Sequence, residues 1–259
     1  MVSVILPCRD AENHLPECID SLESQTLDRY EVLAVDDRSV DGTRHVLEAW
    51  AERDERVRVL RTDREAGLVP ALKLAVAAAR SSLLARMDAD DVALPRRLEL
   101  QVEHMRAHRA LAACGTGVEL FPDELVGDGY SRYAGWLNDL RSPDDLWRDL
   151  LVECPIAHPA LIVRASVLRG LDGYRDAGWP EDYDLVLRMH AAGMRAGNLP
   201  DVLLRWRIRP GRHSLASERY APDAFRRCKA HFLLETVSYT HLTLPTKESR
   251  CRSRWSPYH

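Results

Sequence analysis

The run Leu83-Leu84-Ala85-Arg86-Met87-Asp88-Ala89-Asp90-Asp91 joins an apolar, strand-like stretch to three aspartates. Side chains two residues apart on an extended backbone point to the same side, so Asp88 and Asp90 can approach one hard cation. Carboxylate oxygens suit Mg²⁺ or Mn²⁺, and such an ion can hold a diphosphate. The alternative is an acidic turn that caps the following helix, with Asp90 or Asp91 as the N-cap and Pro95 in the first turn.

Strand and helix signals alternate around this run. Short apolar stretches, separated by segments with apolar residues at helical spacing, predict a repeated β–α pattern. We expect strands at 2–6, 32–35, 57–60 and 83–87, and helices at 15–22, 46–50, 69–79 and 96–108. Strands that are apolar on both faces and separated by helices imply an α/β fold with a parallel sheet covered on both sides.

Two acidic clusters follow strands of this expected sheet. The pair Asp36-Asp37 follows the second strand, and Asp88 and Asp90 follow the fourth. In parallel α/β sheets, ligands bind at the carboxyl ends of the strands. We therefore expect both clusters to face one crevice, which favours a binding site over helix capping.

The composition is that of an ordinary globular protein. The 259 residues suffice for one catalytic domain, hydrophobic residues make up 46%, and a formal net charge of −4 offers no field that attracts nucleic acid. No apolar run approaches the ~18 residues of a membrane-spanning helix, and the first residues do not resemble a signal peptide. We therefore expect a cytoplasmic protein, and peripheral association with the inner face of the membrane is compatible with this composition. The six cysteines lack Cys-x-x-Cys spacing, so we expect reduced thiols rather than zinc ligands or disulfides.

The turn after the first strand excludes two common nucleotide-binding loops. Residues 7–13 read Pro-Cys-Arg-Asp-Ala-Glu-Asn, without the glycines that let a backbone approach a pyrophosphate, and no Walker loop is present. The glycines at 115 and 117 follow the wrong element for such a loop. A diphosphate in the crevice would need a metal on the aspartates, with help from Arg9, Arg64 or Lys73.

Three motifs, in this order, resemble the family 2 inverting glycosyltransferases, which have the GT-A fold. They are Val-Ser-Val-Ile-Leu-Pro at 2–7, the segment Val35–Thr43, and Met87–Asp91 followed by Pro95, Arg97-Leu98 and Gln101. The resemblance continues through 156–159, 173–174 and 181–188, and covers residues 1–235. It implies a single catalytic domain with a mostly parallel GT-A sheet and helices on both faces. Residues 1–115 would form the nucleotide-sugar-binding half and 116–235 the acceptor-binding half.

The resemblance implies sugar transfer from a nucleotide-diphosphate donor, expected to be a UDP-sugar. The acceptor would be a hydroxyl of a glycan or lipid-linked molecule, in cell-surface polysaccharide, glycolipid or glycan synthesis. By motif, Pro7, Asp36 and Asp37 would contact the nucleotide, Asp88 the ribose or the metal, and Asp90 would be the principal ligand for Mg²⁺ or Mn²⁺. For Asp36-Asp37, the alternative is a turn in which Asp37 caps the loop.

The resemblance assigns the role of catalytic base to Asp182. Inversion by single displacement needs a carboxylate that takes the proton from the acceptor hydroxyl. The unperturbed pKa of an aspartate is about 3.9, and burial beside Trp179 and the substrate is expected to raise it. The alternative is that Glu181 and Asp182 only favour the N-terminus of a helix through its dipole. Asp184 is expected to pair with Arg188.

Several positions depart from the family pattern or extend it. Arg209 stands where many relatives have a histidine, and a guanidinium cannot bind a metal but can bind phosphate bidentately. His213, four residues on, is the alternative replacement for that histidine. His158 and Glu181 are further candidates for diphosphate or acceptor contacts. Lys73 stands where relatives often have asparagine, and a solvated helix lysine is its default interpretation.

Two other functions remain open. A nucleotidyltransferase also uses paired aspartates and a metal, but its glycine- and basic-rich loop after the first strand is missing here. A non-catalytic sugar-nucleotide-binding protein should have lost Asp90 or Asp182, and both are present.

Residues 237–259 are expected to lie outside the catalytic domain. From Val237 the sequence loses helical periodicity, gains Ser, Thr and Arg, and resembles a translated sequencing adapter or a frameshifted end. A basic membrane-associating tail is the alternative.

Overall fold

The alternating strands and helices of the first part of the chain build the parallel half of one sheet. The computed structural model describes residues 1–63, 66–209 and 217–243, with side chains through residue 235. In this half, β1 lies between β2 and β4, β3 pairs with β2, and all three pairings are parallel. The elements are β1 (Val2–Cys8), α1 (Leu15–Glu23), β2 (Tyr30–Asp36), α2 (Thr43–Arg53), β3 (Val57–Arg61), α3 (Leu68–Ala78) and β4 (Leu83–Arg86). The predicted β–α pattern is confirmed for these residues.

The second half of the sheet is mixed. The strand order is β3-β2-β1-β4-β7-β6-β8-β5. The strand β7 (Ile162–Arg164) is antiparallel to both β4 and β6 (Leu111–Phe121), and β6 is parallel to β8 (Arg195–Arg207). The two-residue strand β5 (Val92–Ala93) pairs antiparallel with β8 at the sheet edge. The sheet is therefore mostly parallel, as the sequence predicts, with an inserted antiparallel strand and an antiparallel edge that local patterns do not predict.

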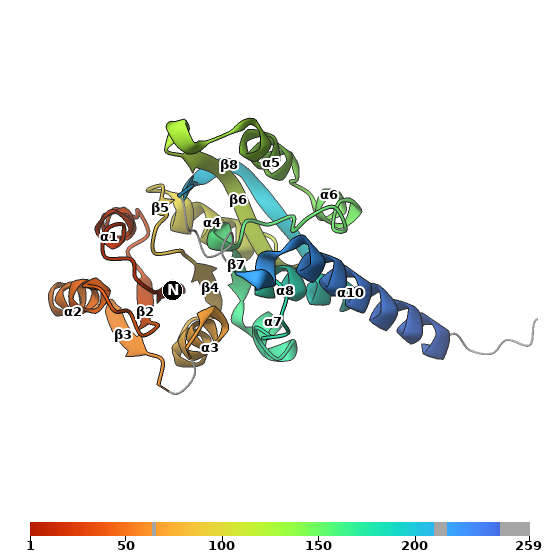
Figure 1. The fold of residues 1–259 in the computed structure, drawn as a ribbon, viewed down its shortest axis with the longest axis horizontal. Helices are drawn as coiled ribbons and strands as arrows, with labels where there is room; N and C mark the ends of the chain where they lie inside the picture. Colours follow the sequence, from red (N-terminus) through yellow and green to blue (C-terminus); the bar gives the residue numbers. More distant parts are fainter. Residues whose placement is uncertain (64–65, 210–216, 244–259) are drawn as a thin grey trace, which may run out of the picture.

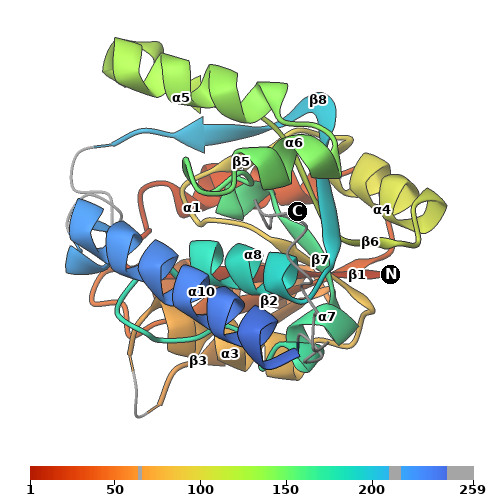
Figure 2. The same ribbon diagram turned by 90° about the vertical axis from the view of Figure 1, so that its right-hand side faces the viewer.

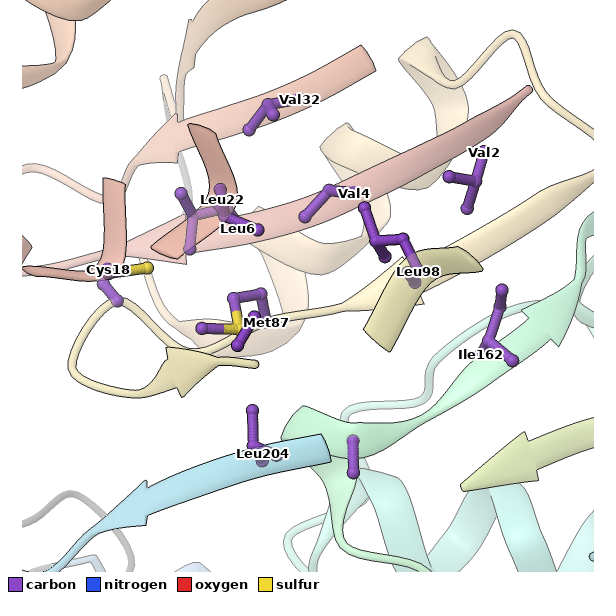
Figure 3. Packing of buried hydrophobic residues seen from close by; sticks show 14 of the residues in the cluster. Val2, Val4, Leu6, Cys18, Leu22, Val32, Met87, Leu98, Ile162 and Leu204 are labelled. Carbon is purple, nitrogen blue, oxygen red and sulfur yellow. The ribbon is translucent and has the colours of Figure 1, made fainter. Parts of the chain in front are cut away.

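Helices cover both faces of the sheet, as predicted (Figures 1 and 2). Alternate residues of a strand point to opposite faces. Leu6 of β1 belongs to one buried cluster with Leu22 of α1 and Leu98 of α4 (Arg97–Ala107), part of which Figure 3 shows. The neighbouring Ile5 belongs to a second cluster, which includes Leu72 of α3 and residues of α8 (Glu181–Ala191).

The remaining helices lie over the second half of the sheet or beside α8. They are η1 (Asp123–Leu125), α5 (Asp128–Asp139), α6 (Pro143–Arg148), η2 (His158–Ala160), α7 (Ala165–Gly170), η3 (Glu218–Tyr220) and α10 (Pro222–Thr243). Helix α10 packs along α8, and its C-terminal end projects from the body of the molecule (Figures 1 and 2). Its backbone stays helical to Thr243, beyond Val237, where the sequence predicts that helical periodicity ends. None of the helices in the described residues combines the length and apolarity needed to cross a bilayer.

The cysteines of the described residues lie in the interior of the fold. Cys8, Cys18, Cys114, Cys154 and Cys228 are buried free thiols, as predicted; Cys251 lies outside the described residues.

The two glycines at 115 and 117 lie inside β6, where β8 comes very close. A Cβ at position 115 would lie 2.2 Å from Oδ1 of Asn198 on β8, so this position needs a glycine for packing rather than for phosphate binding.

Candidate active site

A cavity of about 430 Å³ opens where β1, β2 and β4 end. The parallel register pairs Cys8 of β1 with Asp36 of β2 and Ile5 with Arg86 of β4, so the three strands reach their carboxyl ends at the same edge. The polar and aromatic residues that line the cavity are Arg9, Asp10, His14, Asp37, Arg86, Asp88, Asp90, Tyr133, His158, Glu181, Asp182, Trp206, Arg209 and Tyr220. The expected convergence of the two acidic clusters is therefore confirmed for Asp37, Asp88 and Asp90.

The loops after β1 and β2 are fastened to each other. Asp10 and Arg38 adopt left-handed backbone conformations, with φ of 47° and 57°, that turn both loops sharply. The Asp10 carboxylate accepts a hydrogen bond from the backbone N–H of Val40 at 2.8 Å, and the Glu12 carboxylate accepts one from Gly42 at 2.9 Å. These bonds fix the edge of the cavity that Pro7 and Arg9 line.

The two aspartates after β2 lie in different environments. Asp37 lines the cavity and accepts hydrogen bonds from the Thr62 hydroxyl at 2.8 Å and from the Gly67 N–H at 2.9 Å. Asp36 is fully buried behind the wall, where it accepts from the Ser39 N–H at 3.0 Å. The structure therefore places Asp37 at the cavity and gives Asp36 a part in holding the loop. Both aspartates therefore hold loops, since Asp37 also fixes the segment before α3 through Thr62 and Gly67, and of the two only Asp37 also lines the cavity.

The three aspartates of the central run form a compact group. One ligand oxygen from each of Asp88, Asp90 and Asp91 lies within 4.8 Å of the others. Asp88 and Asp90 line the cavity, whereas Asp91 is fully buried and accepts a hydrogen bond from the backbone N–H of Arg207 at 2.7 Å. The capping alternative is wrong, because β5 intervenes and α4 begins only at Arg97. An oxygen-only group of this size fits a hard divalent cation.

Three arginines contact this acidic group, and two of them, Arg86 and Arg209, pair with its carboxylates. Arg86, buried in β4, donates to the carboxylate of Asp88. Arg207 donates from Nε to the backbone oxygen of Asp90 at 2.6 Å, and Arg209 donates from Nε to its carboxylate at 2.7 Å. Sequence reasoning does not assign a role to Arg86. The signal that could have found it is a charged residue inside an otherwise apolar strand, directly before the aspartates.

Asp182 lines the same cavity from the first turn of α8. Burial raises the pKa of this carboxyl to about 6, and the negative charge of Glu181 adds to the rise. The direction agrees with the prediction, but Trp179 does not line the cavity. Its indole N–H instead donates to Asp184 at 3.1 Å. Asp184 also binds Arg188 at 2.6 Å, which confirms the predicted pair.

Glu181 is the centre of a buried hydrogen-bonded chain beside Asp182. Its carboxylate accepts from the Tyr220 hydroxyl at 2.9 Å and lies 3.5 Å from Nδ1 of His158. Nε2 of His158 lies 3.0 Å from the hydroxyl of Tyr174. Burial alone would raise the pKa of Glu181, but its contacts with His158 and Tyr220 outweigh that effect and lower it. Glu181 therefore keeps its charge next to a carboxyl that loses its own more easily.

Some sequence expectations fall elsewhere. Lys73 is exposed on α3 and does not line the cavity, so the interpretation as a solvated lysine is confirmed. Arg64 and His213 lie outside the described residues. Tyr220, which follows an undescribed segment, has no sequence signal that could have placed it in the site. Tyr133 and Trp206 line the cavity with ring centroids 6.2 Å apart, and provide an aromatic wall.

Comparisons with known proteins show which family the chain belongs to. Residues 3–170 match the model of the glycosyl transferase family 2. The chain is 32% identical over 210 residues to the putative glycosyltransferase EpsE of Bacillus subtilis. The aligned region covers 80% of this chain and 72% of that protein. It is 29% identical over 248 residues to the O-antigen biosynthesis glycosyltransferase WbnJ of Escherichia coli, with coverages of 94% and 91%.

Two solved structures share the fold. Residues 1–349 of TarS from S. aureus, in complex with UDP-GlcNAc, superpose with a TM-score of 0.73 at 19% identity, over 90% of this chain and 66% of that one. The mannosyltransferase PcManGT from Pyrobaculum calidifontis, in complex with GDP-Man and Mn²⁺, gives 0.62 at 21% identity, over 94% and 65%. The chain thus spans slightly less than two thirds of these solved chains. The fold of the chain is therefore the GT-A fold, and the match over residues 3–170 shows that the chain belongs to glycosyl transferase family 2.

Proposed function

We propose that this glycosyltransferase moves a sugar, with inversion, from a nucleotide-diphosphate donor to a hydroxyl of a glycan or lipid-linked acceptor. We expect a UDP-sugar donor, and the UDP-GlcNAc bound by TarS supports that choice. The name of WbnJ supports a role in cell-surface polysaccharide synthesis. The reaction would take place in the cytoplasm, at the membrane surface when the acceptor is lipid-linked. The observation that carries the proposal is that Asp182 and the pair Asp88 and Asp90 line one cavity.

Asp182 would act as the general base. With a pKa of about 6, most of the carboxyl is ionised at neutral pH and is a stronger base than an ordinary aspartate. It would accept the proton of the acceptor hydroxyl while the oxygen attacks the anomeric carbon opposite the leaving diphosphate. The charge of Glu181, held by Tyr220 and His158, keeps the neighbouring carboxyl basic.

Asp90 and Asp88 would hold Mg²⁺ or Mn²⁺ against the donor diphosphate. Their oxygens fit this role, and the fold neighbour PcManGT was solved with Mn²⁺. When bound, such an ion acts as a Lewis acid that stabilises the charge on the departing nucleoside diphosphate. Arg209 would contribute a guanidinium to the same diphosphate. Pro7 and Asp37, with the Gly67 backbone that Asp37 binds, would form the nucleotide side of the cavity.

The test is a screen of UDP-, GDP- and dTDP-sugars with the full chain, in Mg²⁺ or Mn²⁺ and with candidate acceptors. We expect one donor to be hydrolysed or transferred with release of nucleoside diphosphate. The anomeric proton of the product, read by NMR, should have the opposite configuration to the donor. Retention would overturn the inverting mechanism. Donor binding without turnover would favour a non-catalytic protein, and release of pyrophosphate from a nucleoside triphosphate would favour a nucleotidyltransferase.

A further inference from the structure

Arg209 forms an ion pair with Asp90, whose carboxylate the proposed cation site requires. Its Nε is 2.7 Å from Oδ2 of Asp90, and Asp90 contributes an oxygen to the compact acidic group. We propose that Arg209 is an internal counter-cation of this group, which must leave Asp90 before a divalent cation can bind tightly. The diphosphate of a donor would then receive the guanidinium, so cation and nucleotide diphosphate bind together and each binds weakly alone. This inference rests on the proposed function.

The three arginines around the aspartates differ in how firmly they are held. The side chain of Arg86 is 3% exposed and also donates to the backbone oxygen of Met87. Arg207 is 12% exposed, and its guanidinium lies 4.3 Å over the ring of Phe121 and donates to the backbone of Asp90. Arg209 is 33% exposed, and within the described residues its guanidinium has one hydrogen-bonding partner, Asp90. It is therefore the arginine that can move with the smallest loss of contacts.

A cation that arrives alone faces two costs at this site. It must break the ion pair of Asp90 with Arg209, and it must approach a group in which Arg86 already pairs with the carboxylate of Asp88. A diphosphate removes the first cost, because Arg209 lines the same cavity and a guanidinium binds phosphate oxygens well. The two affinities are then coupled, and the coupling is reciprocal by thermodynamic linkage.

The experiment measures Mn²⁺ binding to the full chain by calorimetry, with and without UDP, without any turnover. In the native protein we expect weak binding of Mn²⁺ alone and a strong increase in affinity with UDP. In Arg209→Ala, Mn²⁺ alone should bind about tenfold tighter, the scale of losing a competing, partly buried ion pair. The factor by which UDP increases Mn²⁺ affinity should shrink accordingly. Arg209→Lys, which keeps the charge but loses the guanidinium fork, should lie between the two and serves if the alanine variant does not fold.

Arg205→Ala is the matched control. Arg205 lies on β8, four residues before Arg209, and its substitution removes the same charge, but its partners are Glu119 at 3.5 Å and the ring of Phe121. If it strengthens Mn²⁺ binding as much as Arg209→Ala, the effect is long-range charge and the inference is wrong. Equal Mn²⁺ affinities in the native protein and Arg209→Ala would also overturn it, while loss of binding in Asp90→Ala would leave the proposed cation site standing. If Asp90→Ala binds Mn²⁺ as tightly as the native protein does, both the inference and the cation part of the proposed function fail.

Discussion

At the scale of single residues, the site shifts the pKa values of two neighbouring carboxyl groups in opposite directions. Glu181 receives hydrogen bonds that hold its charge, whereas burial and that charge raise the pKa of Asp182. Pairs of acids whose pKa values are pushed apart are typical of enzymes that move protons. The direction of the pKa shift of Asp182 is predicted from the sequence, but the hydrogen bonds that hold the charge of Glu181 could not be predicted, because His158, Tyr174 and Tyr220 come from distant parts of the chain.

We predict that Asp182→Asn folds, binds donor and cation normally, and loses transfer by about 10²-fold or more, the usual scale for a positioned general base. In the native enzyme, kcat/KM should fall about tenfold per pH unit below pH 6, because the base must be ionised. Single-turnover transfer and donor affinity on the same variant check this. Asp144→Asn, on the exposed surface of α6, is the matched control. A parallel loss of donor binding would instead point to a structural role.

The same substitution should stabilise the protein. A folded-state pKa near 6 against about 3.9 unfolded means that the charged carboxyl opposes folding, so its cost is absent near pH 4 and complete above pH 6. Asp182→Asn should therefore increase the free energy of unfolding at pH 7.5 by up to about 3 kcal/mol, and by little at pH 4. Urea denaturation at both pH values measures the difference. An equal effect at the two values would show that the gain does not come from ionisation.

At the scale of elements, the strands divide into those that local patterns predict and those that they do not. The first four strands repeat a β–α unit, so local patterns locate them and predict their parallel pairing. In contrast, β6 and β8 pair with register shifts around Gly117, and β5 has only two residues. Such pairings depend on tertiary contacts rather than on local periodicity.

Gly115→Ala should destabilise the β6–β8 pair. The new Cβ would meet Oδ1 of Asn198 at 2.2 Å and a methyl of Ile156 at 2.9 Å, and Asn198 is held in place by the backbone oxygens of Leu140 and Pro155. We expect a loss of about 1–3 kcal/mol in the free energy of unfolding, the usual scale for overpacking.

Gly135→Ala provides the control for that substitution. Gly135 lies in α5, and a Cβ there would meet no atom within 4 Å. Because alanine favours a helix more than glycine does, this variant should gain about 0.5–1 kcal/mol. Denaturant titration of both variants gives the comparison. Similar stabilities for the two would show that the side chains of Asn198 and Ile156 move away from position 115 at little cost.

At the scale of the whole molecule, the cavity is assembled from both halves of the chain. Asp37, Asp88 and Asp90 follow strands of the first half, so their convergence could be predicted from the β–α pattern. Asp182 and Arg209 could be located only through motif resemblance, since nothing local shows that they face the same cavity. The separation of Asp36 from Asp37 was beyond prediction, because it depends on how one loop folds around Ser39.

Removal of divalent cations should stop the enzyme. We expect excess chelator to lower turnover by about 10²-fold or more, and Mn²⁺ or Mg²⁺ to restore it, because the leaving diphosphate loses its Lewis acid. Asp90→Ala should be nearly inactive and insensitive to the chelator. Initial rates of nucleoside diphosphate release measure both. Undiminished turnover in chelator would mean that arginines alone stabilise the leaving group.

The buried thiols can serve as probes of local opening of the structure. Cys18 donates to the backbone oxygen of Asp88 at 3.4 Å, in the first half of the chain, whereas Cys228 is buried on α10 in the second half. A thiol reagent can reach each of them only when the surrounding structure opens, so its labelling rate reports the local free energy of opening. Mass spectrometry of the labelled peptides would therefore show which half of the enzyme opens first, and whether a bound nucleotide slows one half and leaves the other unchanged.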